Sequence, residues 1–151
     1  MENIENFKII GIETKTTNQN EKASKDIGKL WGEFFSLNVP SKIVNKESDD
    51  IYAIYTDYES DYTGKYTCVI GMRVNSLEQI PNDLIGREFK NDKYQKFIAK
   101  GEMPNAVVKT WKEIWSKDKE LNRKYTADLE IYGKNSQNGK NSEVSIYIAM
   151  Q

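Results

Sequence analysis

Carboxylates, tyrosines and lysines are the side chains through which this sequence could do chemistry. Its 151 residues include 9 Tyr, 5 Phe and 3 Trp, but no His and a single Cys, Cys68. Zinc fingers, CxxC redox pairs, His-ligated metals and Ser-His-Asp or Cys-His catalysis all need residues that the chain lacks. The sequence therefore predicts no metal site and no cofactor, and directs attention to acidic and aromatic groups.

Glu130 is the carboxylate with the most informative surroundings. Residues 125–132 alternate as a strand does, with Leu129 on one face and Glu130 and Tyr132 on the other. On the next strand, residues 144–150, Tyr147 alternates with aliphatic residues. We expect the aliphatic sides of both strands to form one face that packs against helices, and the carboxylates and tyrosines to lie on the other.

Two interpretations of Glu130 follow from this pattern. In the first, Glu130 lies on the outer, solvent-exposed face of a hairpin, where carboxylates are common and have no binding role. In the second, Glu130 lies in a cleft walled by Tyr and Trp, where a carboxylate is costly to bury until a cation pairs with it. Because aromatic faces attract cations, the second interpretation predicts a site that selects amphipathic cations.

The elements that would position these groups occur twice in the same order. The strands are predicted over 7–16, 51–58 and 66–74, then over 87–99, 125–132 and 144–150; the helices over 21–37 and from 104 to about 121–124. The pentapeptide W-G-E-F-F of residues 31–35 resembles W-K-E-I-W, 80 residues later. We therefore predict an α+β fold of one domain, 1–151, built from two pseudo-symmetric strand-helix-strand-strand units, with halves of approximately 1–80 and 81–151.

The tryptophans lie on the apolar faces of these helices. We expect Trp31 to be a core residue, since that is the usual place of a large aromatic side chain on an amphipathic helix. Trp111 and Trp115 are four residues apart and point the same way, so a helix over a cleft could present either ring to a ligand or to the core.

Five segments, in order, resemble the GyrI-like, or AraC-type effector-binding, domain family over nearly the whole chain. They are I-Y-A-I-Y-T-D-Y-E-S-D-Y at 51–62, Y-T-C-V-I-G at 66–71, Tyr94-x-x-Phe97 with Gly101, Trp111-x-x-Ile114-Trp115, and Y-x-x-D-L-E-x-Y at 125–132. The last corresponds to the family pattern D-F-E-x-Y with Leu129 in place of Phe. Leu129 is expected to face the core, so this departure should alter packing more than the site.

The resemblance implies a curved antiparallel sheet with two helices and a central cleft. It also implies that Glu130 lies in that cleft and pairs with cationic, often aromatic, ligands. The function expected is that of a stand-alone small-molecule-binding protein. Its expected ligand-binding residues are Glu130, Tyr132, Tyr147, Trp111, Trp115 and Tyr55.

Two alternatives of other classes stay open. Some relatives are reported to hydrolyse strained electrophiles, and here Glu130 and Tyr132 would be the catalytic acid and base pair. A protein-interaction role, as attributed to gyrase-inhibitor relatives, would instead require a protein partner.

Charge and hydropathy bear on whether the protein contacts nucleic acid or membranes. The formal net charge is −1, with 22 basic and 23 acidic residues interspersed along the chain, so we expect no direct nucleic-acid binding. The first strand is predicted to begin at about residue 7, so we expect no helix-turn-helix region before it. No signal peptide or membrane span is evident, so we expect a cytoplasmic protein without membrane contact.

Overall fold

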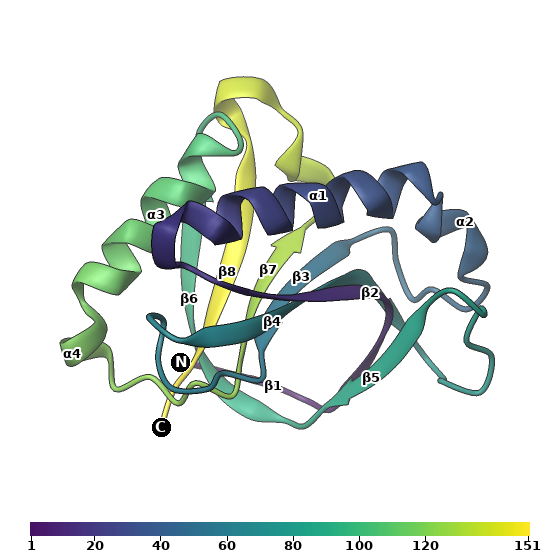
Figure 1. Cartoon of the computed structure of the whole chain (residues 1–151), viewed down its shortest axis with the longest axis horizontal. Helices are drawn as coiled ribbons and strands as arrows, with labels where there is room; N and C mark the ends of the chain where they lie inside the picture. The colour runs from purple at the N-terminus through teal and green to yellow at the C-terminus, as the bar shows by residue number, and fades with distance from the viewer.

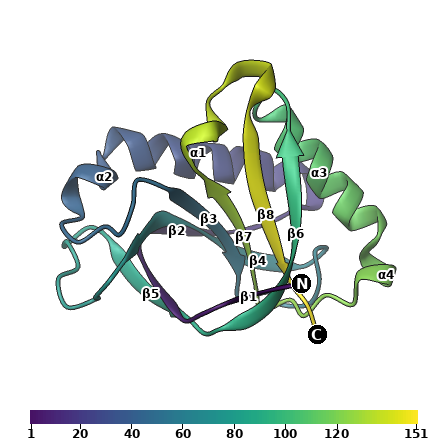
Figure 2. The ribbon, with the colours of Figure 1, turned by 180° about the vertical axis from the view of Figure 1, so that it is seen from behind.

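Eight antiparallel strands form one curved sheet, and two long helices lie on one of its faces (Figures 1 and 2). The computed structural model describes residues 1–151. The strands are β1 (Glu2–Ile4), β2 (Phe7–Thr17), β3 (Ile51–Thr56), β4 (Lys65–Val74), β5 (Ile85–Phe89), β6 (Asp92–Lys100), β7 (Ala127–Tyr132) and β8 (Glu143–Ala149). The α-helices are α1 (Lys22–Ser36), α2 (Val39–Lys42), α3 (Asn105–Ser116) and α4 (Asp118–Leu121).

The strand order is symmetric about the centre of the sheet. The order is β1-β6-β8-β7-β3-β4-β2-β5. Strands β1, β2, β3 and β4 of the first half correspond to β5, β6, β7 and β8 of the second, and corresponding strands lie at equal distances from the centre of the sheet. The two predicted units are β2-α1-β3-β4 and β6-α3-β7-β8, and they meet where β3 pairs with β7. The predicted α+β fold is confirmed, while the residue at which the halves divide stays a prediction.

One strand of each half crosses to the other half, which the sequence did not predict. The predicted strand over 87–99 is divided into β5 and β6, and β5 pairs with β2 of the first half. In the same way β1 pairs with β6 of the second half. These exchanges bind the two units together through backbone hydrogen bonds at both edges of the sheet.

The helices form where the apolar spacing predicted them. Leu30 and Phe34 of α1 are buried, as are Trp111 and Ile114 of α3, so each helix turns its apolar stripe toward the sheet. The second predicted helix is interrupted at Lys117 and continues as α4. Both α1 and α3 lie on the same face of the sheet, so side chains of the two helices can meet over that face (Figure 1).

The expected assignment of the sheet faces is wrong. Leu129 pairs with Tyr147 and Glu130 pairs with Ile146, so Leu129 and Ile146 lie on opposite faces. The helices cover the face that carries Glu130 and Ile146. Alternation fixes which residues of one strand share a face, but it does not fix the register between two strands, and a shift of one residue exchanges the faces.

Both faces of the sheet are apolar as a result. The helix side has one buried cluster beneath α1, including Ile10 and Ile70, and another beneath α3. The other side encloses a third cluster inside the curl of the sheet, which contains Ile54, Leu129 and Tyr94. Leu129 is fully buried there, so it faces a core as expected, though not the core under the helices.

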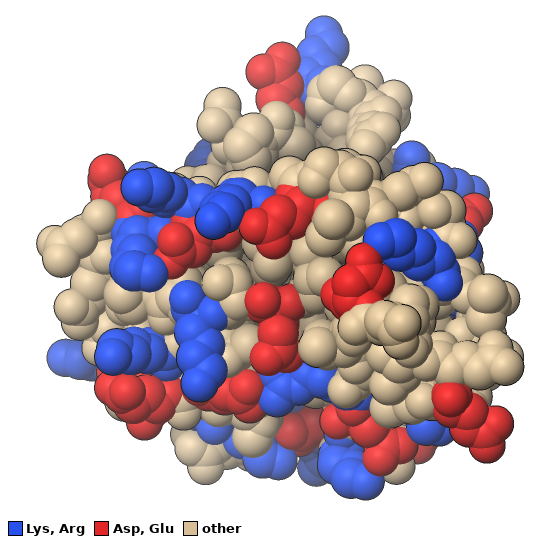
Figure 3. Space-filling view, turned by 45° about the vertical axis from the view of Figure 1, so that its right-hand side comes forward, with Lys and Arg blue, Asp and Glu red and all other residues tan.

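None of the helices combines the length and apolar sequence that crossing a bilayer requires. On the face drawn in Figure 3, basic and acidic side chains are interspersed, so that this face presents no extended field of one sign.

Candidate functional site

A cleft of about 380 Å³ lies between α1, α3 and the helix-covered face of the sheet. Eight of its lining residues are Tyr or Trp, contributed by both helices, by three central strands and by the loop between β3 and β4. They are Trp31, Tyr55, Tyr58, Tyr62, Tyr66, Trp111, Trp115 and Tyr132. Because so many aromatic rings line it, the cleft is suited to flat or apolar molecules.

Glu130 of β7 lies at the base of the cleft and is 1% exposed. Its Oε2 accepts hydrogen bonds from the Tyr55 hydroxyl at 2.8 Å and from Trp111 Nε1 at 2.6 Å. Its Oε1 accepts one from the Tyr132 hydroxyl at 2.6 Å. An indole N–H can only donate, so the Oε2 atom that Trp111 reaches is held as an acceptor.

No lysine or arginine forms an ion pair with Glu130. Burial raises the pKa of its carboxyl above the ordinary value, and the bonds from Tyr132, Trp111 and Tyr55 oppose that rise. Neutral donors solvate a carboxylate without cancelling its charge. Glu130 is therefore a buried acid whose negative charge, once formed, has no partner within the protein.

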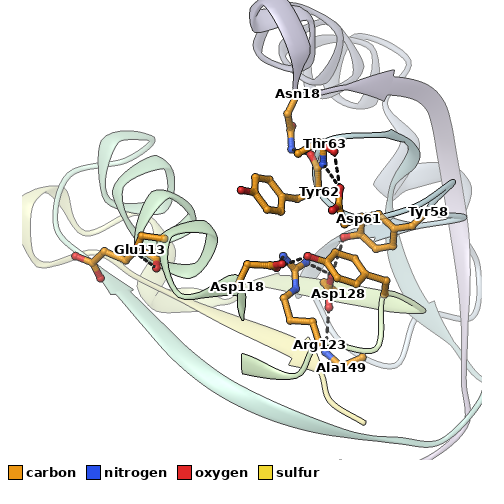
Figure 4. Close-up of polar contacts among 12 residues, drawn as sticks. Asn18, Tyr58, Asp61, Tyr62, Thr63, Glu113, Asp118, Arg123, Asp128 and Ala149 are labelled. Carbon is orange, nitrogen blue, oxygen red and sulfur yellow. Dashed lines mark hydrogen bonds and ion pairs between the residues drawn. The ribbon is translucent and has the colours of Figure 1, made fainter. Parts of the chain in front are cut away.

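Asp128, two residues earlier on β7, shows how the same fold neutralises a buried acid. Arg123 Nη2 lies 2.8 Å from Asp128 Oδ2, and the Tyr58 hydroxyl donates to that oxygen at 2.6 Å. The Ala149 amide donates to Oδ1 at 2.9 Å. Figure 4 shows Arg123 lying between Asp128 and Asp118, to which its Nη1 forms a second ion pair at 3.3 Å. Burial raises the pKa of Asp128, and the charge of Arg123 opposes that rise.

Aromatic contacts fix the walls of the cleft. The Trp31 ring meets the Tyr132 ring edge-on at 5.0 Å, and Tyr55 meets Trp111 edge-on at 5.5 Å. These contacts hold the tyrosines whose hydroxyls reach Glu130. The rings that surround the carboxylate are thus positioned by one another as well as by the backbone.

The loop between β3 and β4 lines the cleft with Tyr58 and Tyr62. Its Tyr62 stacks on Trp115 of α3, with ring centroids 5.7 Å apart and planes at 10°. Asn18 Nδ2 donates to the Tyr62 carbonyl at 2.9 Å, and the Tyr66 hydroxyl donates to Asn18 Oδ1 at 2.6 Å. In Figure 4 the Tyr62 side chain extends from this loop toward α3, so the loop links the two halves across the cleft.

Five of the six expected ligand-binding residues meet in the cleft. They are Glu130, Tyr132, Trp111, Trp115 and Tyr55. Tyr147 does not join them, because it pairs with Leu129 and lies on the opposite face of the sheet, edge-on to Tyr94 at 6.4 Å. The expected face of Tyr147 is wrong because alternation within β8 does not fix the register of β8 against β7.

Sequence reasoning missed four aromatic residues of the cleft. Trp31 was expected in the core; it does contact the core cluster under α1, but it also lines the cleft. Tyr58, Tyr62 and Tyr66 belong to segments that carry the family resemblance, yet they were not assigned to the site. Tyr66 shares its strand face with Cys68 and Ile70 by alternation, and that was the available signal for its orientation.

Known proteins resemble this chain in sequence and in fold. Residues 1–150 match the Cass2 family, described as integron-associated effector-binding protein. YobU of Bacillus subtilis (strain 168), described as a candidate transcriptional regulator, is 28% identical over 144 residues, which cover 93% of this chain and 90% of YobU.

Two solved structures resemble the chain over 99% of its length. An integron cassette protein from the mobile metagenome of Vibrio cholerae is 31% identical, with a TM-score of 0.74 and 94% of that protein covered. SAV2435, solved bound to tetraphenylphosphonium, has a TM-score of 0.82 at 18% identity, with 92% covered, and so shares the fold. By its sequence match over residues 1–150, the chain belongs to the integron-associated effector-binding proteins, GyrI-like modules that bind small molecules.

Proposed function

We propose that the cleft binds an amphipathic organic cation with aromatic groups, and that Glu130 supplies the counter-charge. The observation that carries this proposal is the state of the Glu130 carboxylate. It is 1% exposed, three neutral donors hold it, and no protein cation pairs with it. A ligand cation would provide the missing opposite charge in a place where water screens it poorly.

The pair formed by Asp128 and Arg123 supports this reasoning from within the same molecule. Both acids lie on β7, both are buried, and both accept hydrogen bonds from tyrosine. Asp128 also has a guanidinium at 2.8 Å. Glu130 differs in lacking that cation and in bordering a cleft large enough to receive one from outside.

The aromatic walls support the choice of ligand class. The Arg123 guanidinium lies 4.2 Å from the centroid of the Tyr125 ring, so this protein already holds one cation against an aromatic face. Rings around Glu130 can act on a ligand in the same way, each contributing about 0.5 to 2 kcal/mol when well placed. The shared fold of SAV2435, whose ligand is a tetraaryl cation, agrees with this ligand class.

Calorimetric titration with a matched pair of probes tests the proposal. N-methylquinolinium is a flat aromatic cation, and 1-methylnaphthalene has the same shape without the charge. Loss of the buried charge in Glu130→Gln should weaken cation binding by about 2 kcal/mol or more, which is about 30-fold. The neutral probe should bind both proteins equally.

Glu113→Gln is the matched control, because it removes one negative charge from an exposed position on α3 outside the cleft. It should leave the affinity for both probes unchanged. Equal cation affinity in the wild type and Glu130→Gln would refute the role of Glu130. Turnover of a strained electrophile such as an epoxide, lost in both Glu130→Gln and Tyr132→Phe, would instead support the hydrolytic alternative.

A further inference from the structure

We infer that Gly28 of α1 determines how bulky a ligand the cleft accepts. This inference rests on the proposed function, since it concerns the body of the cation and not its charge. With no side chain at this position, the cleft can admit a non-planar, three-dimensional cation such as a tetraaryl phosphonium. A large side chain at residue 28 would restrict it to flat cations.

Gly28 borders the cleft directly. It is exposed in the structure and lies among the lining residues, one turn before Trp31 and one turn after Ser24. A Cβ added to Gly28 would meet no heavy atom within 4 Å. The volume that a side chain would take at this position is therefore open space beside the cleft and not part of the protein core.

The backbone gives no reason for glycine at this position. Gly28 lies inside α1 and is not among the glycines with positive φ, which are Gly101 and Gly139. At Gly11 and Gly71, by contrast, an added Cβ would lie 2.1 Å and 2.5 Å from backbone oxygens of the neighbouring strand. Substitution at Gly28 is thus tolerated by the fold, and its main consequence is a narrower cleft.

The other side of the opening consists of larger side chains. Val108 of α3 lines the cleft and is 48% exposed, and Trp115 stands about two turns further along the same helix. The two walls of the cleft are therefore unequal. The first half of α1 contributes Ala23, Ser24 and Gly28 beside the larger Ile27, whereas α3 contributes only larger side chains, Val107, Val108, Trp111 and Trp115. Added bulk on α1 would face an α3 wall that the stack of Trp115 with Tyr62 holds in place.

Gly32 provides a matched control on the same helix. It is also exposed, an added Cβ would also meet nothing within 4 Å, and it does not line the cleft. Alanine at either position removes a helix-interior glycine and should raise Tm by about 2 to 4 °C. An equal rise in Tm would show that both positions accept a side chain without loss of the fold, so that a difference in ligand binding reports on the cleft.

The experiment measures Kd for tetraphenylphosphonium and for flat N-methylquinolinium in the wild type, Gly28→Leu and Gly32→Leu. In Gly28→Leu, steric overlap should weaken tetraphenylphosphonium binding by about tenfold or more, with Gly28→Ala showing a smaller loss. N-methylquinolinium should bind Gly28→Leu with nearly its wild-type affinity. Gly32→Leu should bind both probes as the wild type does.

Each other result refutes a distinct statement. If Gly28→Leu binds tetraphenylphosphonium as well as the wild type, or loses both cations equally, Gly28 does not select by bulk. Failure of the wild type to bind tetraphenylphosphonium while it binds N-methylquinolinium also overturns the inference and leaves the proposed function intact. Failure of the wild type to bind either cation overturns the proposed function together with this inference.

Discussion

Asp128→Asn should destabilise the protein far more than Glu130→Gln, although both substitutions neutralise a buried acid of β7. In Asp128→Asn, the Arg123 guanidinium, whose side chain is 1% exposed, loses its partner at 2.8 Å. It keeps Asp118 at 3.3 Å, which is itself partly exposed. The substitution therefore leaves a buried positive charge with incomplete compensation.

The expected magnitudes follow from these environments. Removing one member of a buried ion pair costs about 3 to 5 kcal/mol of unfolding free energy. At Glu130 no pair is broken, and an amide oxygen can still accept from Trp111 and Tyr55 while the amide N–H₂ faces Tyr132. Because a buried charge without a partner is removed, Glu130→Gln should change the unfolding free energy by about 1 kcal/mol or less, or increase it.

Urea denaturation followed by tryptophan fluorescence measures both effects at pH 7. An unchanged m-value would show that each variant unfolds as the wild type does. A loss in Glu130→Gln as large as that in Asp128→Asn would mean that the Glu130 charge stabilises the fold. The Glu130 charge would then already be compensated within the protein, and the reasoning behind the proposed function would be refuted.

Further predictions concern pH and the neighbours of Glu130. Burial raises the pKa of Glu130 in the folded state above its ordinary value of 4.5, so between these two pKa values the folded state holds a proton that the unfolded chain has lost. The unfolding free energy should therefore fall as pH rises through this pH interval. Glu130→Gln should abolish that fall. Cation binding should release a proton in the same interval, measured by calorimetry in buffers of different ionisation enthalpy. Tyr132→Phe removes a donor that lowers this pKa, so it should move the midpoint of pH-dependent binding upward. Tyr147→Phe, on the opposite sheet face, should leave both the midpoint and Kd unchanged; a shift as large as that of Tyr132→Phe would contradict the assignment of faces.

The helices and most strands could be predicted because local periodicity reports them. The apolar spacing of α1 and α3 follows from 3.6 residues per turn, and alternation in β7 places Glu130 and Tyr132 on one face without reference to any other strand. The repeated order of elements predicted the two units. The family motifs then indicated Glu130 as the acid of the site.

Nonlocal contacts decided the rest. The register of β7 against β8 placed Tyr147 on the face away from the helices, and the position of α1 over the sheet brought Trp31 to Tyr132. Arg123 and Asp128 are only five residues apart, but their pairing depends on the turn between α4 and β7, where no periodicity operates, and it leaves Glu130 as the buried acid without a cation. Periodicity determines which residues of one element share a face. Which faces meet, and which charges are neutralised, depends on the packing of the elements and on the turns between them, so only the tertiary structure could show it.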